Sequence, residues 1–161
     1  MNDLLNVVLI GIGATGVMDL WCLIRQSLLR VAMPNYGLVG RWIAHMPRGR
    51  FRHNNIKDSA SVRGEAILGW LTHYLVGITF AAMLVAIWGM AWIELPTIAP
   101  ALAVGVGSVT APFFLMQPGM GAGIAASRTP HPASARLQSL ITHIVFGCGL
   151  YLAARIILLI D

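Results

Sequence analysis

The sequence predicts an all-α fold, a four-helix transmembrane bundle with a short interfacial helix in its first connection. Two observations carry this prediction. The chain is 57% hydrophobic and only 11% charged, whereas charged residues make up about 25% of an average soluble domain. Its apolar residues also fall into runs near the length, about 20 residues, with which a helix crosses a bilayer. The expected spans cover residues 4–23, 66–93, 98–116 and 137–160 of a single integral membrane domain, 1–161.

The first expected span, residues 4–23, starts without the basic segment of a signal peptide, so we expect an uncleaved helix. Three glycines along it permit the close approach of a neighbouring helix: Gly11, Gly13 and Gly16. Asp19 lies about one turn before the end of this span. A carboxylate at that depth is costly unless it faces the bundle interior or water.

The connection after the first span, residues 25–64, is long and basic. Four of its apolar residues follow helical spacing and stop before Pro47: Val39, Trp42, Ile43 and Met46. They predict a short interfacial helix, because Trp beside Arg is typical of the headgroup zone. Arg48, Arg50 and Arg52 come next. They predict contact with anionic lipid headgroups, with a plain topology signal as the alternative.

The remaining spans carry their own markers. Trp88 and Trp92, near the end of the second span, fit an aromatic belt. Pro112 is expected to kink the third span or to end it early. The glycine-rich segment 117–123 follows, and we expect it to form a re-entrant or tightly packed loop. It lacks the Gly-Lys-Ser/Thr sequence of a phosphate-binding loop.

The basic residues set the expected orientation. Eight of the eleven Lys and Arg residues lie between Arg25 and Arg63, and the link between the second and third spans has none. Cytoplasmic loops collect Lys and Arg, so we expect an inner (plasma) membrane protein whose termini both lie in the periplasm. The same distribution explains the net charge of +5 through topology, and nucleic acid is not an expected partner.

Two short patterns occur twice. Residues 72–77 and 142–147 each have the form Thr-His-x-x-x-Gly, and residues 11–13 and 105–107 each have the form Gly-x-Gly. In each case one copy lies in each half of the chain. The matches favour two parallel two-helix repeats, with chance similarity between apolar sequences as the alternative.

Three ionisable side chains lie at one expected depth. Asp19, His73 and His143 are each roughly 10 Å from the cytoplasmic end of their helices, and Gln117 lies at or below that level. Ionisable groups inside a membrane turn toward one another or toward water. We therefore expect these four residues to form a cytoplasm-facing polar site for a small solute, a proton or a cofactor.

The residues leave the use of this site open. The side chains can simply bond neighbouring helices, or they can bind a solute or a proton. His73 and His143 are also candidate axial ligands of a b-type haem, and with Asp19 they are candidate ligands of a divalent metal. No Ser-His-Asp or Cys-His set can be assigned, so an enzyme is not favoured. The other histidines lie in the connections and are expected to be exposed or interfacial: His45, His53 and His131.

Several segments of the chain resemble one family: residues 13–21, 35–53, 69–74 and 111–121. The most specific stretch is 46–53, Met-Pro-Arg-Gly-Arg-Phe-Arg-His. The family is a bacterial one catalogued as domain of unknown function 2938, and the resemblance covers nearly the whole chain. It implies a small four-helix inner-membrane protein and no particular activity.

The expected function is therefore that of a multi-pass protein of the lipid bilayer with a polar intramembrane site. The rival interpretation is a structural or accessory subunit that packs against a membrane protein partner or a second copy of itself.

Overall fold

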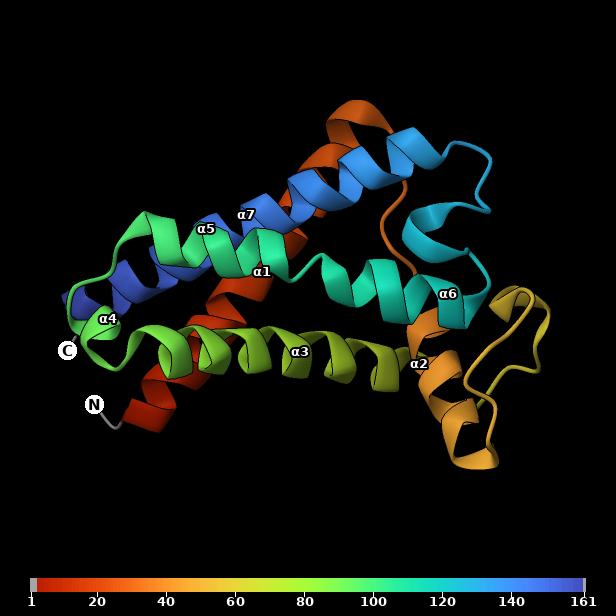
Figure 1. Ribbon diagram of the computed structural model, residues 1–161, viewed down its shortest axis with the longest axis horizontal. Helices are drawn as coiled ribbons and strands as arrows, with labels where there is room; N and C mark the ends of the chain where they lie inside the picture. Colours follow the sequence, from red (N-terminus) through yellow and green to blue (C-terminus); the bar gives the residue numbers. More distant parts are fainter. Residues whose placement is uncertain (1–2, 161) are drawn as a thin grey trace. The chain divides into compact units, whose positions relative to one another are not determined.

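The computed structural model describes residues 3–160, which are helical throughout their ordered elements and contain no strand (Figure 1). Four helical stretches are long and apolar enough to cross a membrane: α1 (Asp3–Leu29), α3 (Glu65–Trp88), the segment Ile98–Met120 and α7 (Pro132–Ile160). This confirms the predicted all-α class with four membrane-length helices, and it indicates a multi-pass membrane protein.

The helix ends differ from the predicted ones for local reasons. α1 continues to Leu29 rather than stopping near residue 23, because no Gly or Pro interrupts the chain there. α7 begins at Pro132 rather than near residue 137, since proline suits a first helical position. α3 ends at Trp88, where Gly89 has a φ of 82°, and a separate short helix, α4 (Ala91–Glu94), follows.

The third membrane-length stretch is interrupted, as the proline at 112 predicted. Its first part, α5, covers Ile98–Gly107. A π-helical turn, η3 (Pro112–Met116), comes next and leads directly into α6 (Gln117–Met120). Pro112 has no backbone N–H to continue the α-helical ladder, and the chain forms one π-helical turn from this residue.

The chain divides into two compact units, which are described separately. Unit 1 comprises Met1–Met33, Tyr74–Ser108 and Leu140–Asp161. Five of its core residues, from α1, α3 and α7, are at most 1% exposed: Ile10, Ala14, Leu84, Leu150 and Ala154. Large apolar side chains such as Leu75 and Leu159 remain exposed, as expected of surfaces that face lipid tails.

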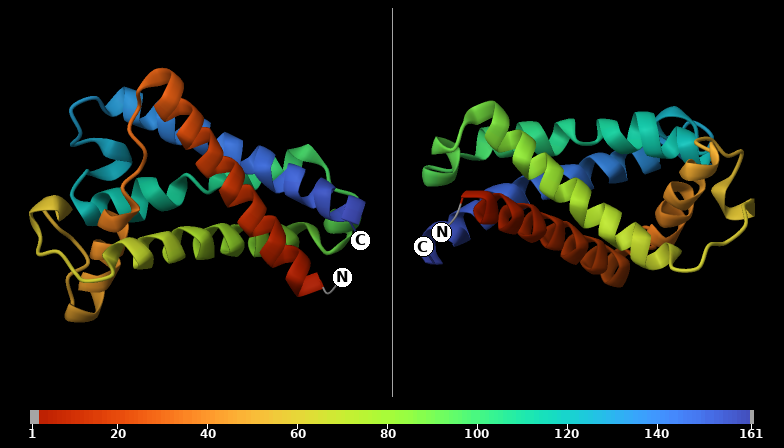
Figure 2. Two further views of the ribbon diagram at one scale, coloured as in Figure 1. Left: turned by 180° about the vertical axis from the view of Figure 1, so that it is seen from behind. Right: turned by 90° about the horizontal axis from the view of Figure 1, so that it is seen from below.

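Glycines bring the helices of unit 1 into close contact. A Cβ atom on Gly11 of α1 would lie 2.5 Å from the Cα of Ile78 in α3, and one on Gly77 would meet Thr15 of α1. A Cβ on Gly105 of α5 would meet the backbone of Gly147 in α7. Helices α5 and α7 run side by side (Figures 1 and 2). The glycines are therefore required by backbone approach, which is how small residues associate membrane helices.

Unit 2 comprises Pro34–His73 and Val109–Ser139. It contains α2 (Tyr36–His45), the short turns η1 (Met46–Arg48) and η2 (Ile56–Asp58), the start of α3, η3, α6, η4 (Ile124–Ala126) and the start of α7. The predicted short helix before Pro47 is thus present as α2. Gly40 of α2 and Gly69 of α3 are each required by proximity, since a Cβ on either would meet the backbone of the other helix.

Candidate functional site

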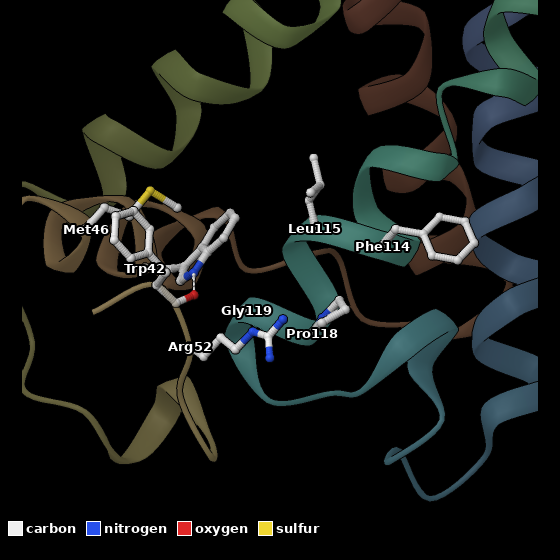
Figure 3. A pocket seen from close by; sticks show the side chains of 8 residues that line it. Trp42, Met46, Arg52, Phe114, Leu115, Pro118 and Gly119 are labelled. Carbon is white, nitrogen blue, oxygen red and sulfur yellow. Dashed lines mark hydrogen bonds between the residues drawn. The ribbon is translucent and has the colours of Figure 1, made fainter. Parts of the chain in front are cut away.

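Unit 2 contains a pocket of about 350 Å³ with mainly apolar walls and one cationic side chain (Figure 3). Its lining comes from α2, the turn after α2 and the η3–α6 segment: Trp42, Met46, Phe51, Arg52, Phe114 and Leu115, with Pro118 and Gly119. Residues 42–52 and residues 114–119, which are distant in the sequence, therefore line the same pocket.

The turn after α2 is held in place by local chemistry. Proline at position 47 starts a 3-10 turn, and Gly49 reverses the chain with a φ of 74°, a conformation that glycine adopts readily. The indole Nε1 of Trp42 donates to the carbonyl oxygen of Phe51 at 2.9 Å, and the backbone N–H of His53 donates to the Gly119 carbonyl at 2.9 Å. Gly119 has no room for a side chain, because a Cβ there would lie 2.6 Å from the Trp42 ring.

The turn after α2 carries three arginines. Arg48, Arg50 and Arg52 are all exposed. Arg48 donates to the Ala44 carbonyl at 3.2 Å, which leaves its charge without a carboxylate. Within residues 3–160, Arg50 and Arg52 form no side-chain hydrogen bond and no ion pair. Their charges are therefore available to an anion outside the chain.

Arg41 lies on α2 in the same unit and behaves differently. Its Nη2 and Nε donate to the two carboxylate oxygens of Glu65 at 2.7 and 2.9 Å. Its Nη1 donates to the Ser59 carbonyl at 3.1 Å. The hydrogen bond to Glu65 raises the pKa of the Arg41 guanidinium above its usual value. A bidentate pair of this kind fixes geometry as well as charge, so Arg41 ties α2 to the start of α3.

Two histidines of unit 2 are more enclosed than expected. His45 is only 5% exposed, so exposure, one of the two alternatives expected for it, is wrong, and an interfacial His45 stays a prediction. Its Nε2 lies 3.0 Å from the Ala60 carbonyl, and the Nδ1 of His53 lies 2.8 Å from the Ser59 hydroxyl. The two rings meet edge to face with centroids 5.2 Å apart. Sequence reasoning missed this pair because it depends on how the segment 45–60 folds back, which no periodicity encodes.

Asp19 of α1 is 9% exposed and accepts a hydrogen bond from the Tyr74 hydroxyl at 3.0 Å within unit 1. This partner was not predicted, although Tyr74 directly follows His73 in the repeated pattern. A buried carboxylate with a phenol donor is a satisfied group.

His143 of α7, also in unit 1, lies with its Nδ1 2.7 Å from the Ser108 hydroxyl. That hydroxyl is also 2.6 Å from the Gly105 carbonyl, to which it donates. A serine has one proton, so Ser108 accepts from Nδ1–H of His143.

The remaining predicted residues belong to unit 2. The His73 ring stacks on Tyr36 of α2, with centroids 4.1 Å apart and planes at 23°. The Oε1 of Gln117 is buried and has no hydrogen-bond partner among residues 3–160. The structure brings Asp19 to Tyr74, His143 to Ser108 and His73 to Tyr36. A common site of Asp19, His73, His143 and Gln117 stays a prediction, as does haem on the two histidines.

The described part of the chain holds no group of three or more His, Cys, Asp or Glu side chains arranged to bind a metal ion. A divalent metal held by Asp19, His73 and His143 stays a prediction.

The fold and the arginine-bearing pocket define a multi-pass helical membrane protein with a basic, apolar-walled connection. The chain belongs to the family described as Protein of unknown function (DUF2938), whose pattern matches residues 8–157, nearly the whole chain. The comparisons with curated proteins and with solved structures each found no match.

Proposed function

We propose that this membrane protein binds the anionic headgroup of a phospholipid at segment 46–53, while the adjoining pocket receives an apolar part of the lipid. The observation that carries the proposal is the combination of the two features in one place. Arg52 lines a pocket whose other walls are mainly apolar, and Arg52 and its neighbour Arg50 have no carboxylate among the described residues. An amphipathic anion complements both.

Charge supports a negative occupant. Residues 34–64 contain six Lys and Arg residues and a single acid, Asp58. The Arg41 charge is matched by Glu65, and the arginines at 48, 50 and 52 are not matched in this way. Each basic residue near an anionic membrane surface contributes roughly 1 kcal/mol of attraction. The three arginines together would favour an anionic over a neutral lipid surface by about 3 kcal/mol, which is well above thermal energy.

Exposed apolar groups support a lipid rather than a small inorganic anion. Phe51 and Phe114 are each 59% exposed, and Leu115 is 67% exposed. Side chains of this size leave contiguous apolar surface only where something apolar covers it. Helix α2, with Trp42 on one side and arginines after its end, has the composition of an interfacial helix.

The test uses the full-length protein in a maltoside detergent. Phosphatidylglycerol with brominated acyl chains quenches tryptophan fluorescence on contact, and a Trp42→Phe variant identifies the share of quenching that belongs to the pocket. Brominated phosphatidylcholine gives the zwitterionic reference. We expect the protein to prefer phosphatidylglycerol. The double variant Arg50→Gln/Arg52→Gln should lose roughly tenfold to thirtyfold of that preference, at about 1 kcal/mol per charge.

The matched control is Lys57→Gln/Arg63→Gln, which removes two exposed positive charges from the same connection. It should keep the preference. Equal losses in the two double variants would reduce the arginines to a diffuse topology signal and would contradict the proposal, as would no loss in either.

A second candidate function is an intramembrane proton or solute site at Asp19. The specific observation in its favour is a carboxylate only 9% exposed inside a membrane-length helix, since such residues tend to be functional. Infrared difference spectra between neutral and acidic pH test it. We expect a carboxyl band that Asp19→Asn removes and that Tyr74→Phe shifts. A spectrum unchanged by Asp19→Asn would exclude this function.

The same proposal places the protein in an inner membrane with both termini in the periplasm. In this orientation segment 46–53 would face the cytoplasmic leaflet, which carries the negative surface potential, so the orientation and the lipid contact are consistent with each other. The equivalent glycine contacts of Gly11 with Gly77 and of Gly105 with Gly147 favour a duplicated two-helix unit as the origin of the bundle.

A further inference from the structure

Two buried N–H donors lie on one face of α1 near its end. They are the indole Nε1 of Trp21 and the guanidinium Nε of Arg25, and neither has a hydrogen-bond partner within residues 3–160. The two residues are four apart in the helix, so their side chains are neighbours, with Cβ atoms about 6 Å apart. Buried N–H groups nearly always have an acceptor. Two orphaned donors side by side therefore indicate an acceptor outside the chain.

The surroundings of Arg25 give a second, independent indication. Its side chain is only 7% exposed, although arginine is almost never fully buried without a partner. Its one hydrogen-bond contact joins Nη2 to the sulfur of Cys22 at 4.0 Å, and a thiol sulfur is a weak acceptor. No carboxylate in the described part lies within ion-pair distance of it. An uncompensated buried charge is strongly destabilising.

The helix itself offsets only part of this cost. Arg25 is four residues before the last residue of α1, Leu29. The partial negative charge at a helix C-terminus stabilises a cation there. It does not supply an acceptor to Nε of Arg25 or to the indole N–H of Trp21, because the free carbonyls point along the axis beyond the helix end.

We propose that Trp21 and Arg25 form a binding site for a phosphate oxyanion, carried by a lipid headgroup or by free phosphate. An oxyanion supplies both the negative charge and several acceptor oxygens, and arginine binds phosphate through parallel N–H donors. The location suits a headgroup, since Arg25 is roughly 6 Å along the axis from the end of a membrane-length helix. The site belongs to unit 1 and is independent of the lipid contact proposed for segment 46–53.

The experiment uses the full-length protein with ¹⁵N-labelled tryptophan in a maltoside detergent, which contains no phosphate. The Trp21 indole N–H resonance is assigned with Trp21→Phe. Sodium phosphate is added in one arm and phosphatidylglycerol in the other, each against sodium chloride at equal ionic strength. We expect the Trp21 resonance to move downfield. The indole of Trp92 already donates to the Thr97 carbonyl at 3.2 Å, and its resonance is the internal control that stays in place.

The arms distinguish the sources. A shift with phosphatidylglycerol alone assigns a lipid headgroup, a shift with sodium phosphate alone assigns a free phosphate, and a shift with both assigns an oxyanion site without preference.

The Arg25→Gln variant should weaken the response of the Trp21 resonance at least about tenfold, as expected for a lost charge-assisted bond. The control variant Arg30→Gln removes an exposed charge just after α1 and should not weaken the response. No movement of the wild-type Trp21 resonance in either arm would overturn the proposal, whether or not the variants fold.

Discussion

The connection between α1 and α3 uses arginine in two opposite ways. Arg41 is bound at both carboxylate oxygens of Glu65 and joins two helices of unit 2. Arg50 and Arg52, on the turn that follows, have no side-chain partner in the part of the chain that the structure describes. The residue type is the same and the sequence distance is short. What separates Arg41 from Arg50 and Arg52 is that the fold provides a carboxylate for Arg41 alone among these three.

The largest expected effect comes from breaking the structural pair. Arg41→Gln leaves the Glu65 carboxylate without its bidentate partner and also removes the bond to the Ser59 carbonyl. We expect the thermal midpoint of the full-length protein in detergent to fall by several degrees. The Arg63→Gln variant, at an exposed arginine, should leave it unchanged.

A double variant sharpens this result. In the Glu65→Gln background, Arg41→Gln should cost less than it does alone, because the pair acts as a unit. If the two substitutions are additive, Arg41 and Glu65 do not stabilise each other and the contrast with the free arginines fails.

The next effect concerns salt. Raising sodium chloride from about 0.1 M to about 1 M shortens the Debye length from roughly 10 Å to roughly 3 Å. The preference for phosphatidylglycerol over phosphatidylcholine should fall steeply, because Arg50 and Arg52 are exposed. Binding measured by bromolipid quenching checks this. A preference that does not depend on salt would indicate an apolar contact alone.

The smallest effect concerns the support of the turn. Trp42→Phe keeps an aromatic ring in the pocket but removes the hydrogen bond to the Phe51 carbonyl. A typical hydrogen bond contributes about 1 kcal/mol, so we expect a modest loss of stability and a few-fold loss of phosphatidylglycerol preference, measured by lipid retention in native mass spectrometry. If the retention of phosphatidylglycerol did not change, Arg50 and Arg52 would bind lipid without needing the hydrogen bond from Trp42 to Phe51.

Much of the fold could be predicted from sequence because lipid imposes a simple rule on the backbone. A spanning segment must satisfy its own hydrogen bonds and be apolar for about 20 residues, and the four spans follow from that. The end of α1 at Leu29 and the start of α7 at Pro132 were missed, because polar residues can continue a helix beyond the apolar run.

The candidate site was less predictable. The two copies of the Thr-His pattern suggested equivalent histidines, yet His143 bonds to Ser108 whereas His73 stacks on Tyr36. Tyr36 belongs to α2, an element that only the first half of the chain contains. The repeated pattern therefore could not predict that His73 stacks on Tyr36. The Arg41–Glu65 pair likewise joins residues 24 apart, and such pairing depends on tertiary structure alone.

The most direct test of the central claim measures contact between the free arginines and lipid phosphate. Solid-state NMR detects it as dephasing of arginine Cζ signals by the phosphorus of phosphatidylglycerol in bilayers containing the full-length protein. We predict that Arg50→Gln/Arg52→Gln removes a distinct part of this dephasing and that Arg41→Gln removes none. Dephasing that survives unchanged in the double variant, or that disappears with Arg41, would contradict the account.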